Sequence, residues 1–116
     1  MINISVPESY AIDYLSILEV KLDKENTSTN EINYMKCLVD ISNQIENLHI
    51  ILKSHEYANL YEANLNIFTA IEHIHKGKRM SAKELDSLNY ERFKAKQVIQ
   101  KKYFDNVPGE VKIGYK

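Results

Sequence analysis

The stretch that decides the fold is Leu52-Lys53-Ser54-His55-Glu56-Tyr57, near the middle of the chain. It separates two runs of apolar residues at helical spacing, and no glycine or proline lies between them. The runs are Leu38, Ile41, Ile45, Leu48 and Leu52, and then Leu60, Ile67, Ile71 and Ile74. A turn at residues 54–56 predicts a four-helix bundle. One uninterrupted helix over residues 32–75 would instead predict an elongated molecule that needs a partner chain.

Upstream of these runs, the sequence predicts one helix and then a loop. Ser5 and Glu8 have the spacing of a capping box, with Pro7 in the first turn, so we expect a helix to begin near residue 5. Its apolar seam ends near Asp23. Residues 24–30 are polar without periodic apolar residues, which indicates a loop before a second helix over residues 32–52.

Downstream, residues 75–84 carry the signals of a helix end followed by a helix start. Gly77 suits the left-handed position just beyond a helix, and Ser81 with Glu84 forms a capping box. The sequence therefore predicts a third helix that ends near His75 and a fourth that stops before Pro108.

Both ends of the sequence alternate apolar and polar residues, which is the pattern of a short strand with one buried face. The alternating residues are Ile2, Ile4 and Val6 at one end and Val111, Ile113 and Tyr115 at the other. We expect them to pair as a small ribbon. The predicted fold class is therefore mainly all-α: an antiparallel helical bundle of three to four helices with short terminal β segments, forming one domain over residues 1–116.

The composition is that of an ordinary globular domain, with 44% hydrophobic and 27% charged residues and a net charge of -1. Cys37 is the only cysteine, so neither an intrachain disulfide nor a cysteine zinc cluster can form within one chain. The sequence shows no signal peptide and no apolar run of membrane-spanning length. We therefore expect a cytoplasmic protein that makes no membrane contact.

Two Glu-x-x-His pairs, Glu46/His49 and Glu72/His75, have the spacing used in di-iron helical bundles. With a turn near residue 55, however, the two pairs would be offset along the bundle by about 12 Å, which is too far for one ion to bridge. We therefore expect no metal and no cofactor in the single chain. A carboxylate and histidine site formed across a dimer is the second alternative function.

Charge is distributed unevenly along the chain. Residues 1–58 hold 4 basic and 9 acidic residues, whereas residues 59–116 hold 11 basic and 7 acidic residues. The basic patch expected between the third and fourth helices consists of Lys76, Lys78, Arg79 and Lys83. A nucleic-acid-associated regulator that uses this half of the chain is the first alternative function, although Glu84 and Asp86 would repel phosphates.

Catalytic motifs are missing: the sequence contains no nucleophile elbow, no glycine-rich loop and no clustered catalytic carboxylates. Tyr57, Tyr61 and Phe68 recur at helical spacing and are the candidate partner-binding residues, since aromatic side chains give large contact areas. The predicted function is a small protein-interaction or regulatory module, such as an inhibitor, adaptor or assembly factor, without catalytic activity. Its partner is a protein, and self-association is left open.

Overall fold

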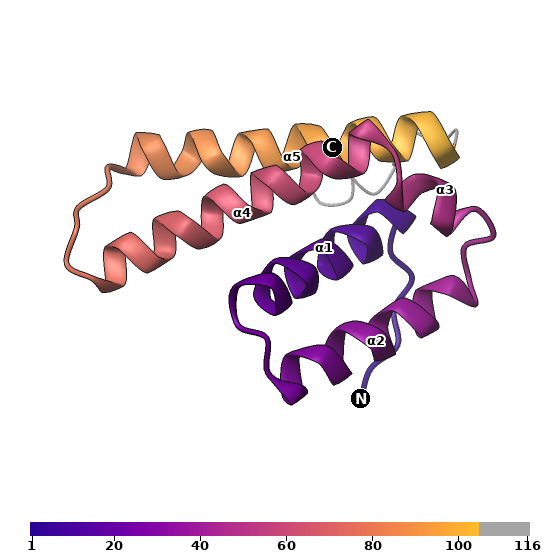
Figure 1. The fold of residues 1–116 in the computed structure, drawn as a ribbon. Helices are drawn as coiled ribbons and strands as arrows, with labels where there is room; N and C mark the ends of the chain where they lie inside the picture. The colour runs from indigo at the N-terminus through magenta and orange to yellow at the C-terminus, as the bar shows by residue number, and fades with distance from the viewer. Residues whose placement is uncertain (105–116) are drawn as a thin grey trace.

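The computed structural model describes residues 1–104, and these form five helices and no strand (Figure 1). The helices are α1 (Glu8–Lys24), α2 (Ser28–Ser42), α3 (Leu48–Leu52), α4 (His55–His75) and α5 (Ala82–Phe104). One hairpin consists of α1 and α2, and a longer one consists of α4 and α5. Because α1 contacts α2, α4 and α5, it joins the two hairpins, and the predicted all-α bundle is confirmed.

The deciding stretch is a turn. Helix α3 ends at Leu52 and α4 begins at His55, with Ser54 as its N-cap. The Ser54 hydroxyl accepts the Tyr57 N–H at 3.1 Å and donates to the Ile51 carbonyl oxygen. This cap satisfies one of the free N–H groups at the start of α4, so the chain reverses here and does not continue as one long helix.

The prediction of a single helix over residues 32–52 is wrong. Helix α2 ends at Ser42, and five residues without helical structure precede α3. The break falls where residues of low helix propensity gather, namely Ser42, Asn43 and Asn47. In this region the Ser42 hydroxyl donates to the Leu38 carbonyl oxygen at 2.6 Å, which illustrates how such side chains compete for backbone groups.

The predicted capping box at Ser5 is also wrong, because α1 begins at Glu8 with Pro7 in the N-cap position and no side-chain cap. A helix capped by Ser5 would need Val6 in helical conformation. The ring of a following proline disfavours that conformation, so the helix begins only after Pro7. The predicted end near Asp23 is within one residue of the observed end at Lys24.

The turn between α4 and α5 has the predicted features. Gly77 has φ +87°, the left-handed conformation that glycine adopts without strain. The Lys78 N–H donates to the His73 carbonyl oxygen at 2.9 Å and the Gly77 N–H to that of Ile74 at 3.0 Å, which together form a Schellman motif. The Ser81 hydroxyl accepts the Glu84 N–H at 3.1 Å, and the Glu84 carboxylate accepts the Ser81 N–H at 3.3 Å.

The predicted N-terminal strand is not formed, since residues 1–7 are irregular and the described part of the chain contains no strand that could pair with them. A strand requires hydrogen bonds to a neighbour, which the alternation of Ile2, Ile4 and Val6 cannot supply alone. The other half of the predicted ribbon, residues 111–115, lies outside the described residues. None of the five helices in residues 1–104 has both the length and the apolar character needed to cross a membrane.

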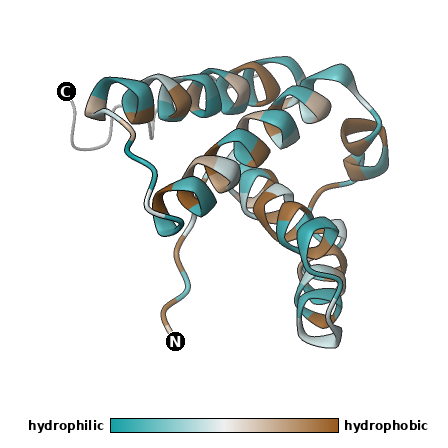
Figure 2. Ribbon diagram, turned by 60° about the vertical axis from the view of Figure 1, so that its left-hand side comes forward, coloured by the Kyte–Doolittle hydropathy of each residue, from teal (hydrophilic) through white to brown (hydrophobic). Residues whose placement is uncertain are grey.

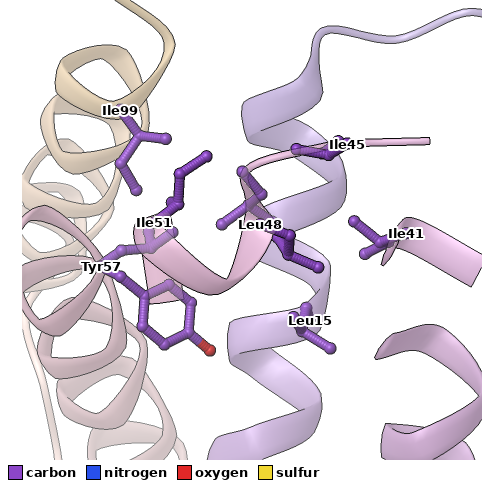
Figure 3. Close-up of a cluster of buried hydrophobic side chains, with 9 residues drawn as sticks. Leu15, Ile41, Ile45, Leu48, Ile51, Tyr57 and Ile99 are labelled. Atoms are coloured by element: carbon purple, nitrogen blue, oxygen red, sulfur yellow. The ribbon is translucent and has the colours of Figure 1, made fainter. Parts of the chain in front are cut away.

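The main apolar core surrounds α3. Figure 3 shows Leu48 and Ile51 of α3 inserted between the α4–α5 hairpin on one side and the α1–α2 hairpin on the other. The buried members of this cluster are Ile12, Leu15, Ile41, Ile45, Leu48, Ile51, Tyr57, Leu60 and Ile99. The five residues of α3 therefore supply side chains that fill the space where the two hairpins meet.

Removal of the α4 cap should destabilise the protein. For Ser54→Ala we expect the free energy of unfolding to fall by about 1 kcal/mol, measured by urea denaturation, because the Tyr57 N–H loses its acceptor. Ser87→Ala is the matched control, since Ser87 is exposed within α5 and its hydroxyl caps no helix. An equal effect of the two substitutions would contradict the role assigned to Ser54.

Candidate interaction surface

Besides the apolar contacts of the core, helix α1 meets the α4–α5 hairpin through polar side chains. Asp13, only 4% exposed, lies at the centre of this contact. Its carboxylate accepts two hydrogen bonds at 3.1 Å from Nε of Arg92 and a third from Nη2. Asn64 of α4 donates to Asp13 at 3.0 Å and to the Ser16 hydroxyl at 3.1 Å. The Asp13 carboxylate thus connects α1 with α4 and α5. It is paired and hydrogen-bonded, as a buried charge must be.

A second cation lies beside this pair. Nζ of Lys96 is 3.8 Å from the Asp13 carboxylate and 4.4 Å from the centre of the Tyr10 ring. Burial lowers the pKa of Lys96, and the charge of Arg92 acts in the same direction, whereas the Asp13 carboxylate opposes them. The hydrogen bonds from Arg92 to Asp13 raise the pKa of Arg92. The closer and better-oriented guanidinium is therefore the principal partner of Asp13.

Helix α5 also supplies the missing cap of α1. The Ser9 N–H in the first turn of α1 donates to the Gln100 side-chain oxygen at 2.8 Å, and the Gln100 amide donates to the Glu8 carboxylate at 2.9 Å. A residue 91 positions away therefore does what Ser5 was expected to do. This contact holds the start of α1 against the last turns of α5.

The other end of α1 is held by two tyrosines of α4. The Tyr57 hydroxyl donates to the Glu19 carboxylate and the Tyr61 hydroxyl donates to the Asp23 carboxylate. Burial and the neighbouring carboxylate raise the pKa of each phenol, so both stay protonated donors well above neutral pH. The N-terminal half of α4 therefore contacts the C-terminal half of α1. Helix α1 crosses α4 and does not run along the full length of α4.

This crossing leaves a notch between α1 and the far half of the hairpin. Its volume is about 230 Å³, and apolar side chains dominate its wall. The lining residues are Ile17, Val20, Lys21, Asn64, Ile67, Phe68, Ile71 and Arg92. Ile71 at the edge of the notch is 46% exposed, and Ile74, which follows on α4, is 40% exposed. In Figure 1 the hairpin extends past α1 on the side that carries the α4–α5 turn.

The tip of the hairpin is cationic. The four residues of the predicted basic patch, Lys76, Lys78, Arg79 and Lys83, are all exposed around the α4–α5 turn. None of them forms an ion pair with a side chain among residues 1–104. The structure therefore brings the predicted patch together at one end of the molecule, next to the apolar residues that extend from the notch.

A second exposed apolar surface lies on α2. Ile32, Met35 and Val39 follow one another at helical spacing on its solvent face, and Met35 is 47% exposed. Apolar residues are also exposed in the N-terminal coil, which has brown segments in Figure 2. Neither surface is bordered by a cationic cluster like the one at the hairpin tip.

The two Glu-x-x-His pairs are not brought together. Glu46 and His49 are exposed at the α2–α3 end of the molecule. Glu72 lies about 25 Å from the first residue of α4, at a rise of 1.5 Å per residue, and His75 is the last residue of that helix. Among residues 1–104 no three His, Cys, Asp or Glu side chains are close enough to hold a metal ion. A site formed across a dimer stays an untested alternative.

The three predicted aromatic contact residues have different positions. Tyr57 is 5% exposed and belongs to the core, so it offers a partner little surface. Tyr61 is half-buried with its hydroxyl held by Asp23, whereas Phe68 lines the notch. The sequence did contain signals for the residues we missed. Ser9, Asp13 and Ser16 share a helical face, and Arg92 lies on the apolar arc of its helix.

Comparisons with protein-family models, with curated proteins and with solved structures find no match. We therefore infer function only from the side chains of the notch and of the hairpin tip.

Loss of the central carboxylate should destabilise the protein. For Asp13→Ala we expect the free energy of unfolding to fall by roughly 2 kcal/mol in urea denaturation. This is less than the roughly 3–5 kcal/mol of fully buried pairs, because the Arg92 side chain is 30% exposed and can reach water. Asp40→Ala, at an exposed carboxylate of α2, should change stability by about 0.5 kcal/mol or less. A comparable loss in both variants would contradict the central role of Asp13.

Proposed function

We propose that the protein is a cytoplasmic interaction module that binds the apolar face of a helix from a partner protein in the notch between α1 and the α4–α5 hairpin. The observation that carries this proposal is the set of apolar side chains that the crossing of α1 leaves uncovered, with Phe68 in the wall and Ile71 half-exposed. Apolar grooves between helices are a common docking site for amphipathic helices, which anchor a few large side chains in them.

The chemistry of the polar residues favours binding over catalysis. Asp13, Arg92 and Asn64 hold one another, so their hydrogen-bonding groups serve to join the helices. Burial raises the pKa of the Cys37 thiol, which lowers its thiolate fraction and its nucleophilicity at neutral pH. These polar groups therefore stabilise the fold, and the fold presents the notch to a partner.

Selection from a phage-displayed library of helical peptides tests the proposal directly. The intact protein should enrich peptides with large apolar residues at helical spacing, and Ile71→Asp should abolish their binding because it places a carboxylate at the rim of the notch. Met35→Asp is the matched control. It introduces the same charge on the other apolar surface, where the exposed fraction is nearly equal, 47% against 46%.

The outcome depends on which variant loses binding. Peptides that survive Ile71→Asp but are lost with Met35→Asp would move the docking site to α2. Failure to enrich any apolar helical peptide over background would contradict the proposed function.

Nucleic-acid binding is the second candidate function, and the four exposed, unpaired cations at the hairpin tip favour it. Such side chains attract phosphate charge without reading bases. Glu84 is close by, and Asp86 is exposed two residues further along α5. These carboxylates oppose the attraction, so affinity should be low.

Gel shifts with a short duplex and a single strand should show binding at low salt that is lost at physiological salt, with no sequence preference. The double substitution Lys78→Glu/Arg79→Glu should remove the low-salt binding, whereas Lys101→Glu at the other end of α5 should retain it. Sequence-specific binding that survives physiological salt would make nucleic acid the leading partner.

A further inference from the structure

The notch and the cationic tip are parts of one continuous surface. Along α4, one side of the helix carries a row of residues at positions three, four, seven and eleven after Asn64, namely Ile67, Phe68, Ile71 and His75. The first members of this row line the notch beside α1. The last ones extend beyond α1 to the end of α4, where the exposed cations begin. From Asn64 to His75 the row is about 16 Å long, or three helical turns.

The cations beside this row are available to a partner. Lys21 is an exposed residue at the α1 rim of the notch, and Lys76, Lys78 and Arg79 are exposed at the tip. None of these four forms an ion pair with a described side chain. The α1 carboxylates nearest this region are already engaged, Asp13 by Arg92 and Asp23 by Tyr61.

From this pattern we infer that the partner helix is acidic as well as amphipathic. Its apolar face occupies the row from Ile67 to Ile71, and carboxylates beside that face pair with Lys78 and Arg79 at the tip and with Lys21 at the rim. This inference rests on the proposed function and adds the charge of the partner. Complementary charge at the rim of an apolar contact chiefly sets partner choice and association rate, and it also adds some affinity.

The geometry favours an acidic helix over a nucleic acid as the occupant of the whole surface. A polyanion would use the tip but would place phosphates against Ile71 and Phe68 in the notch. Two polar residues of the notch lining, Asn64 and Arg92, already donate to Asp13. Lys21 is the one cation among the lining residues that is not already bound to Asp13. Only a ligand with an apolar side and a negative side satisfies both halves of the surface.

Two fluorescent helical peptides of about 18 residues provide the test. They share one apolar face and differ only at flanking positions, which carry Glu in the first peptide and Gln in the second. Fluorescence anisotropy at low and physiological salt gives their affinities for the full chain. The Glu peptide should bind about ten-fold more tightly at low salt, the size expected from two or three surface ion pairs together, and salt should reduce the difference.

Two variants separate this inference from the function on which it rests. Lys78→Glu/Arg79→Glu should remove the advantage of the Glu peptide and leave the Gln peptide unaffected, whereas Ile71→Asp should abolish binding of both. Lys36→Glu/Lys101→Glu is the control for total charge, since both lysines are exposed and lie away from this surface.

Equal affinity of the two peptides, with both lost on Ile71→Asp, would overturn the acidic partner and leave the proposed function intact. Binding of neither peptide would overturn both. A third outcome is that the Glu peptide still binds the Ile71→Asp variant and that oligo-dT displaces it at physiological salt. That outcome would assign the tip to nucleic acid and overturn the inference.

Discussion

The structure depends on the burial of the Asp13 carboxylate. A carboxylate that is only 4% exposed must be hydrogen-bonded and paired, and its partners come from two different helices, Arg92 of α5 and Asn64 of α4. These partners determine where α1 crosses the hairpin. Because α1 is held there, it cannot also run along the far half of α4, and the apolar residues of that half lose the cover that a parallel neighbour would give. The notch is thus a consequence of the buried pair.

The polar contacts between α1 and the hairpin therefore differ in kind from the apolar core around α3. Around Leu48 and Ile51, shape and apolar area stabilise the packing without directional preference. Between α1 and the hairpin, each carboxylate has a specific donor, from Gln100 at Glu8 to Tyr61 at Asp23. Such contacts add little net stability compared with apolar residues of equal size, but they penalise any other register, since a shifted helix would leave a buried charge unpaired.

Local signals in the sequence were sufficient for much of the fold. Gly77 and Ser81 identified the α4–α5 turn because a left-handed residue and a capping hydroxyl act within a few positions of each other. The capping box predicted at Ser5 was wrong because Pro7 overrides that pattern. The break after Ser42 was missed because the apolar periodicity continues through it and conceals the weak helix formers Ser42, Asn43 and Asn47. Of the candidate site, the basic cluster and Phe68 were predicted. The notch was not, because it arises from the Asp13–Arg92 contact across 79 positions, which no local pattern encodes.

The same long-range contact has a consequence for the order in which the chain acquires its structure. During synthesis, α1 emerges from the ribosome 79 residues before Arg92 and 91 residues before Gln100. Until then Asp13 must stay hydrated, and the first turn of α1 lacks its acceptor. The α1–α2 hairpin can form early through apolar contacts, but α1 can be fixed against α4 and α5 only after release of most of α5. Until α5 has been synthesised, the first helix of the nascent chain therefore exposes its polar side.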